Sequence, residues 1–282
     1  MKKIKKFWQN ILKYIPFVKA GAKNVLAYKA SFFMWFIISI VEVGFIIFLY
    51  NAIYNSSPDP NGIIHGFTFN ELILYMVTSF IFSFSIGNNE TTWNMFEDIR
   101  EGTISSTLTK PVSYRLRHLF TCLGSAGLSV CVFLVPLLTI IYGFFIGFGL
   151  ITVTWTFIFD VIIFIGLMFL AIILNDAISY FIGLLTFYTE HMFGLSMIKN
   201  SVQGFLSGQM IPLSYMGMFG VVCSYTPFAF INSVPVLMLM GKTAAVDGVI
   251  YFAIALAWVI GIELANHFLF THCIKKLTVQ GG

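Results

Sequence analysis

Residues 89–118 read NETTWNMFEDIREGTISSTLTKPVSYRLRH, a charged segment within a mostly apolar chain. This segment holds eight charged residues, although the whole protein has only 16 basic and 12 acidic residues. Long apolar runs lie on both sides of it, so the sequence predicts a polar connection between two membrane spans. Because four of its charges are basic, we expect this connection to face the cytoplasm.

The composition indicates that lipid surrounds most of the chain. Of 282 residues, 58% are hydrophobic and 10% charged, whereas soluble domains carry roughly 25% charged residues. Half of the basic residues fall within the first 29 positions, so the net charge of +4 does not indicate nucleic-acid binding. The four cysteines lack the spacing of a metal or redox site. They are Cys122, Cys131, Cys223 and Cys273.

The N-terminal residues 1–29 predict an amphipathic element on the cytoplasmic surface. Between residues 4 and 15, apolar side chains share one helical face and lysines lie opposite them. This pattern is typical of a helix lying in the interface of an anionic leaflet. Pro16 is expected to end this helix, and a second short helix is expected over 17–29.

The apolar runs predict an all-α integral membrane fold with six transmembrane helices in one domain over residues 1–282. Residues 89–116 form the cytoplasmic loop, and 210–243, interrupted by proline and glycine, predict short external re-entrant helices. Both termini are expected in the cytoplasm, because basic residues concentrate in the cytoplasmic segments. The fourth apolar run exceeds one membrane thickness, which leaves its boundary with the fifth open. The spans are expected at about 31–53, 69–87, 117–143, 154–186, 192–209 and 246–270.

Residues 90–101 predict a short amphipathic helix near the membrane surface. Trp93, Phe96 and Ile99 recur at helical spacing, and Gly102 follows where a helix-ending glycine is common. The helix is either a lever moved by a cytoplasmic partner or an ordinary solvated loop helix. As a lever, its apolar residues would anchor it on the membrane side while its charged residues engage the partner. Those charged residues are Glu97, Asp98, Arg100 and Glu101.

Five ionisable residues fall within apparent spans. A charge at the bilayer centre costs on the order of 2.5–3.5 kcal/mol on insertion scales, so such residues usually face protein or water. They either line a polar translocation path or form interhelical hydrogen bonds and interfacial contacts. Glu42, deep in the first span, is the strongest path candidate, and the interfacial interpretation leads for the two aspartates. The five are Glu42, Asp160, Asp176, Lys199 (a candidate partner for one of the acids) and Glu263.

The sequence contains no phosphate-binding G-x-x-x-x-G-K-[ST] loop, no H-E-x-x-H and no G-x-S-x-G. We therefore expect no catalytic residue, no metal site and no cofactor in this chain, which is not expected to be an enzyme. The absence of an internal repeat disfavours secondary transporters built from inverted repeats.

Two segments resemble the type 2 ABC transporter permeases. DIREGTISSTLTKPVSYRL, residues 98–116, is similar to that family's cytoplasmic loop, with an acidic–basic helix, a glycine, and a leucine before Lys-Pro-Val. FLSGQMIPL, residues 205–213, resembles the family's Ser-Gly-x-x-Ile-Pro-Leu segment at the outer end of the fifth span. The likeness extends in order and spacing over nearly the whole chain, with Phe187–Tyr188 where the family often has Phe-Trp.

The resemblance implies a permease subunit of an ATP-driven ABC exporter in the bacterial cytoplasmic membrane. It implies an N-terminal elbow helix, a coupling helix between spans two and three, and external re-entrant helices. Two copies of a separate ATPase would bind ATP and Mg, and a second permease, either a copy or a different subunit, would complete the path. The alternatives are a non-transporting membrane scaffold or assembly protein and an ion-coupled secondary transporter. The substrate is left open. The implied coupling residues are Trp93, Phe96, Glu97, Asp98, Ile99, Arg100, Glu101 and Gly102.

Overall fold

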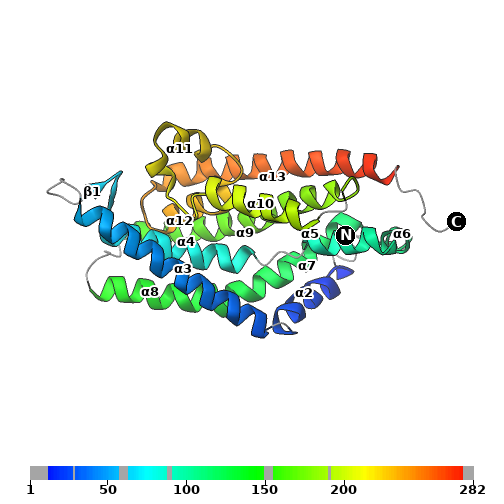
Figure 1. Cartoon of the computed structure of the whole chain (residues 1–282), viewed down its shortest axis with the longest axis horizontal. Helices are drawn as coiled ribbons and strands as arrows, with labels where there is room; N and C mark the ends of the chain where they lie inside the picture. Colours follow the sequence, from blue (N-terminus) through cyan, green and yellow to red (C-terminus); the bar gives the residue numbers. More distant parts are fainter. Residues whose placement is uncertain are drawn as a thin grey trace.

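The structure, a computed structural model, is an elongated bundle of helices that run mostly along one axis (Figure 1). Helices α5 (Thr91–Arg100) and α6 (Thr103–Leu108) lie at one end of the bundle, here called the α5 end. The short hairpin of β1 (Ile63–Ile64) and β2 (Phe67–Thr68) lies at the other, the hairpin end. The residues that the structure describes are 12–27, 29–56, 63–87, 91–148, 155–189 and 192–275.

Among the described residues, five helical segments are long and apolar enough to cross a bilayer. The chain is therefore an all-α membrane protein with several spans. The bounds of the helices follow the apolar runs closely, and the expected span 69–87 coincides with α4. The five segments are α3 (Lys29–Asn55), α4 (Phe69–Gly87), the continuous run of α7, η1 and α8, α9 (Trp155–Leu185) and α13 (Ala245–Ile274).

The expected fifth span, 192–209, is the short helix α10 (Met192–Leu206). Its 15 residues extend about 22 Å at 1.5 Å per residue, less than a hydrocarbon core of about 30 Å. Gly208, with a φ of 77°, turns the chain soon afterwards. Helix α10 alone is therefore too short to count as a sixth span.

The third apolar run is one continuous helix with a π-helical turn in its middle. It comprises α7 (Tyr114–Ser129), η1 (Val130–Leu134) and α8 (Val135–Gly147). Pro136 lies in the first turn of α8, and a local π turn is one way to accommodate a proline inside a span. Ser113 caps α7, because its side chain accepts from the backbone N–H of Leu116.

Helix α2 (Ile15–Ala27) packs on α7, and Pro16 lies in its first turn, where a missing N–H is tolerated. The second N-terminal helix is thus present, but it begins before Pro16 instead of after it. Most of the first expected helix, 4–15, lies outside the described residues.

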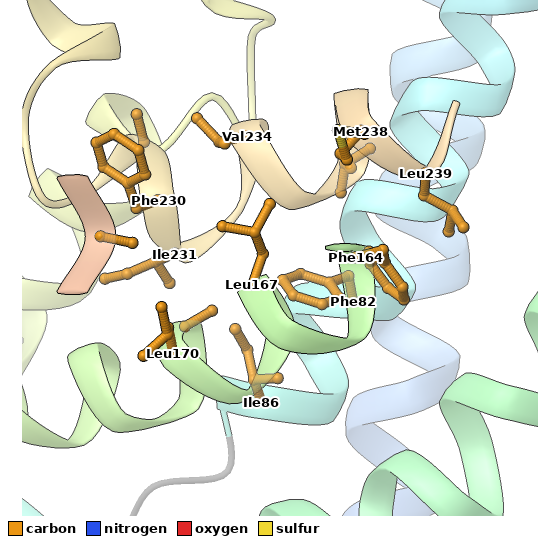
Figure 2. Close-up of a cluster of buried hydrophobic side chains, with 14 of the residues drawn as sticks. Phe82, Ile86, Phe164, Leu167, Leu170, Phe230, Ile231, Val234, Met238 and Leu239 are labelled. Carbon is orange, nitrogen blue, oxygen red and sulfur yellow. The ribbon is translucent and has the colours of Figure 1, made fainter. Parts of the chain in front are cut away.

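The expected re-entrant region folds into four short helices near the hairpin end (Figure 1). Its main contacts are with α4 and α9, and Figure 2 shows side chains from these elements meeting in the main core. The tight entry to the region is fixed by Tyr75, whose hydroxyl donates to the carbonyl of Gly208 at 2.8 Å. The four helices are η2 (Leu213–Met216), α11 (Gly217–Ser224), η3 (Ala229–Ile231) and α12 (Ser233–Leu239).

A second, smaller hydrophobic core lies at the α5 end, apart from the main one. It joins α5 and α6 to the ends of α7 and α9, and α13 packs against it. Its buried members are Met95, Ile104, Tyr114, Tyr180 and Leu184.

Candidate functional site at the α5 end

Two adjacent threonines fix the start of α5 to α9. The Thr91 hydroxyl donates to Asp176 Oδ1 at 2.6 Å, and the Thr92 hydroxyl donates to the backbone carbonyl of Ser179 at 2.9 Å. Both threonines are buried. Because Asp176 and Ser179 are three residues apart on α9, they share one face of that helix, and α5 lies along it.

Met95, one turn further along α5, completes the docked face. Its side chain is fully buried, and a Cβ at Gly183 would come within 2.7 Å of its Sδ atom. Gly183 follows Asp176 by two helical turns, so the absence of a side chain there lets α5 approach the same stripe of α9.

The opposite face of α5 is exposed. Trp93 is 41% exposed, and Glu97 and Arg100 are exposed as well, at i, i+4 and i+7 of one stripe. Trp93 therefore lies off the face that docks on α9, whereas Met95 lies on it. Of the other expected anchors, Ile99 packs against the second core and Phe96 is half-buried.

Asp98 also differs from its expected role, because its carboxylate is engaged within the chain. It accepts from the Tyr114 hydroxyl at 3.1 Å and from the Thr103 hydroxyl at 3.0 Å, and it forms an ion pair with Arg117 at 3.4 Å. These contacts fix the end of α5 to the start of α7. Gly102, with a φ of 70°, ends α5 as expected, and Glu101 is exposed.

Next to the docked face lies a cluster of charges, here called the ion cluster, formed by Arg115, Asp176 and Glu263. Arg115 Nη1 lies 2.5 Å from Asp176 Oδ2, and its Nη2 lies 2.5 Å from Glu263 Oε1. Asp176 is fully buried, and Glu263 is about a third exposed. The guanidinium also lies over the ring of Tyr180, 4.7 Å from its centre. Three long helices, α7, α9 and α13, thus meet at one side chain.

The ion cluster changes the interpretation of Asp176 and Glu263. As path-lining residues, they would face water or substrate. In the structure both bind Arg115, which belongs to the charged segment, so the interhelical alternative holds for them. Sequence patterns do not identify Arg115 or Thr91 as site residues. Arg115 counts only among the basic residues that indicate the cytoplasmic side, and no local pattern singles out Thr91.

Neutral amide side chains near the ion cluster form further hydrogen bonds between helices. Asn175 donates to the carbonyl of Ile86 and accepts from Gln203, both at 3.0 Å. Asn266 of α13 donates to the carbonyl of Ala177 at 2.9 Å. These amides join α4, α9, α10 and α13 next to Asp176.

The family comparison agrees with this architecture. The sequence model of the ABC-2 family transporter proteins matches residues 25–281. The chain belongs to the ABC-2 transporter family. This finding confirms the resemblance to type 2 ABC permeases and makes the chain a transmembrane transporter component, from a family whose members have no catalytic activity of their own. No curated protein and no solved structure matches it.

Of the remaining predicted ionisable residues of this ABC-2 protein, Lys199 lies near the ion cluster and Asp160 lies apart from it. Lys199 of α10 is partly buried one turn before Gln203, and its charge interacts with the carboxylate of Asp176, a member of the ion cluster. Asp160 is buried toward the hairpin end, close to Gly241. Of the candidate acids, Asp176 is therefore the one that interacts with Lys199.

Glu42 lies in the middle of α3 and is exposed. The opposite face of α3 lines an apolar pocket of about 270 Å³ against α4 and α8, with Phe36, Ile40 and Val43 contributing from α3. Glu42 is out of register with these three residues, so it points away from the rest of the chain. In this ABC-2 protein, a carboxylate at membrane depth thus remains on the outer surface.

Proposed function

We propose that this chain is the permease subunit of an ATP-driven exporter and that α5 is the element on which a separate ATPase subunit docks. The observation that carries the proposal is the division of α5 into two faces. Thr91, Thr92 and Met95 fasten it to α9, while Glu97 and Arg100 remain exposed beyond the spans. Exposed charges on a helix that is anchored to the spans suit a soluble partner.

In this mechanism, ATP and Mg bind to two copies of the ATPase, and no cofactor binds to the permease itself. Closure of the two ATPases on ATP would displace α5. Because α5 is docked along α9, its displacement would move the α5 ends of the spans and open a path. Trp93, Glu97 and Arg100 would contact the ATPase, and Glu101 extends the same charged region.

The proposed topology places the α5 end in the bacterial cytoplasm. The basic residues of the charged segment and of the N-terminal region favour that side. Helix α2 then corresponds to the elbow, α5 to the coupling helix, and α10 together with the short helices η2 to α12 to a sixth, re-entrant crossing. Both termini would lie in the cytoplasm.

Glu42 supports a second permease beside this one. A carboxylate facing lipid at this depth would cost on the order of 2.5–3.5 kcal/mol. A second subunit, or a water-filled path between the two subunits, would remove that cost. We therefore place the Glu42 face of α3 toward the path or the second permease.

The proposal is tested by purifying the chain from its host in mild detergent and identifying the copurifying proteins by mass spectrometry. An ABC ATPase is expected in stoichiometric amount, and Glu97→Lys is expected to remove most of it. The matched control is Asp247→Lys, which reverses an exposed acid at the opposite end of the bundle.

Two results would contradict the proposal. A wild-type preparation without any ATPase would favour the scaffold or secondary-transporter alternatives. Equal ATPase retention in Glu97→Lys and Asp247→Lys would show that α5 is not the docking element.

A further inference from the structure

We infer that the ion cluster, together with Thr91, is the set of positioning residues that relays a displacement of α5 to α7, α9 and α13. The inference rests on the proposed function, because it concerns how movement of a docked α5 reaches the spans. It assigns the relay to the buried carboxylate of Asp176 with Thr91 and Arg115, and not to the docked face of α5 in general.

The first step of the argument is that Asp176 binds two different elements through its two oxygens. Oδ1 accepts from the hydroxyl of Thr91, the first residue of α5, and Oδ2 is bound by Arg115, the second residue of α7. Asp176 itself is fully buried in α9. A shift of α5 therefore acts directly on a group that also holds α7.

The second step concerns the geometry of Arg115. Its Nη1 donates to Asp176, while its Nε and Nη2 donate to Glu263. A guanidinium is a planar fork, so binding on two sides fixes its orientation as well as its position. Helices α7, α9 and α13 cannot rotate independently without losing one of these bonds.

The third step is energetic. A carboxylate left unpaired in a buried site is strongly disfavoured, because water does not replace the lost partner. Rearrangements that keep the cluster intact are favoured over those that break it. The helices joined by Arg115 are therefore expected to move together when α5 moves.

Thr92 provides an internal control for this relay. It is buried like Thr91 and also donates one hydrogen bond to α9, but its acceptor is the backbone carbonyl of Ser179. Thr92 therefore fastens α5 to α9 without contacting the ion cluster. A comparison of substitutions at the two adjacent threonines therefore distinguishes the docking of α5 from the transmission of its movement through the ion cluster.

The experiment uses the complex of permease and ATPase reconstituted in lipid nanodiscs. Spin labels at Ala52→Cys in α3 and Val246→Cys in α13, in a Cys131→Ser background, report the distance between these helices at the hairpin end. Both labelled positions are exposed, and the buried native cysteines are retained. Distances are compared without nucleotide and after trapping with ATP and vanadate.

In the unsubstituted protein, trapping with ATP and vanadate is expected to change the distance between the two spin labels. In Thr91→Val, the shifted population should fall about tenfold, the order expected for losing a hydrogen bond to a charged acceptor. Thr91→Ser, which keeps the hydroxyl, should restore the shift, and Thr92→Val should keep it. Arg115→Lys should lose it, because an ammonium group cannot bridge both carboxylates in the same way. ATPase copurification should be unchanged in all four.

The relay is overturned if Thr91→Val and Arg115→Lys shift as the unsubstituted protein does. It is also overturned if Thr92→Val loses the distance change as completely as Thr91→Val. Loss of the ATPase from Thr91→Val would overturn it as well. In both cases docking of α5 alone would explain the effect. A bound ATPase without any shift in the unsubstituted protein likewise overturns it. Absence of the ATPase from the unsubstituted protein would instead contradict the proposed function.

Discussion

Gly21 of α2 and Gly124 of α7 lie at the same helix crossing, each against the backbone of the other helix. A Cβ at Gly21 would overlap the carbonyl oxygen of Thr121, and a Cβ at Gly124 would overlap the carbonyl oxygen of Val18. Glycine at both positions allows the two backbones to touch. The N-terminal helix is therefore held on the third span by backbone contact, next to the charged segment.

This contact predicts that Gly124→Ala separates α2 from α7. We expect a loss of about 1–3 kcal/mol in stability, because the added methyl group meets backbone that cannot rotate away. Gly127→Ala is the control, since no atom lies within 4 Å of a Cβ there. The midpoint of thermal unfolding in detergent should fall for Gly124→Ala alone. Equal midpoints would show that the crossing is loose.

The ion cluster predicts a large effect for Arg115→Leu. Removing the guanidinium leaves Asp176 and Glu263 without their cation, and breaking a buried pair in this way costs about 3–5 kcal/mol. Adding Asp176→Asn and Glu263→Gln to Arg115→Leu should recover much of the loss, because neutral amides replace the unpaired carboxylates. Unfolding in detergent measures both variants. A triple variant no more stable than Arg115→Leu would contradict this account.

Glu97 and Asp98 are adjacent, but their substitution by alanine should affect stability differently. Asp98→Ala removes the acceptor for Tyr114 and the partner of Arg117, so we expect a loss of about 1–3 kcal/mol in stability. Glu97→Ala should change stability little, because Glu97 is exposed. Thermal unfolding of the two variants side by side checks this, and equal destabilisation would show that Glu97 also makes stabilising contacts within the chain.

Gly208 is expected to tolerate no side chain, for two separate reasons. Its φ of 77° is strained for alanine by about 1–2 kcal/mol, and a Cβ would also lie 2.9 Å from the Tyr75 hydroxyl. Gly102 has a φ of 70° but open space around its Cβ position, so Gly102→Ala isolates the strain. Gly208→Ala should lower the unfolding midpoint further than Gly102→Ala. A smaller fall in the midpoint for Gly208→Ala would show that contact with Tyr75 does not limit the side chain at position 208.

The exposed position of Glu42 predicts that Glu42→Leu inserts and folds normally, since leucine lowers the cost of placing this face in lipid. Under the proposed function, the same variant should reduce association with the second permease, and Glu42→Gln should reduce it less because it keeps a hydrogen-bonding group. Phe45→Leu, on the same exposed face, is the control. Native mass spectrometry of the detergent complex measures the association. Unchanged association in Glu42→Leu would remove the case for contact there.

The sequence predicted the elements well where short-range rules apply. The apolar run 69–87 coincides with α4, and Gly102 follows the end of α5. It predicted a full fifth span less well, because the length of a short helix beside a turn at Gly208 depends on what it packs against.

The candidate site was predicted as a location, but its contacts were not. The amphipathic pattern of α5 assigned Trp93, Phe96 and Ile99 to the membrane side and indicated no contact with α9. The docked side is instead chosen by partners on α9, where Asp176 and Ser179 accept from threonines and Gly183 leaves room for Met95.

The sequence by itself determined that this protein lies in a membrane and where several of its helices begin and end, because hydropathy and helix capping depend on residues close together in the chain. Only the tertiary structure decided which charges meet. Arg115 binds Asp176, 61 residues away, and Glu263, 148 residues away, and no short-range pattern distinguishes these partners from Glu42 or Asp160. An intramembrane charge must find some partner, and the packing of distant helices determines which one it finds.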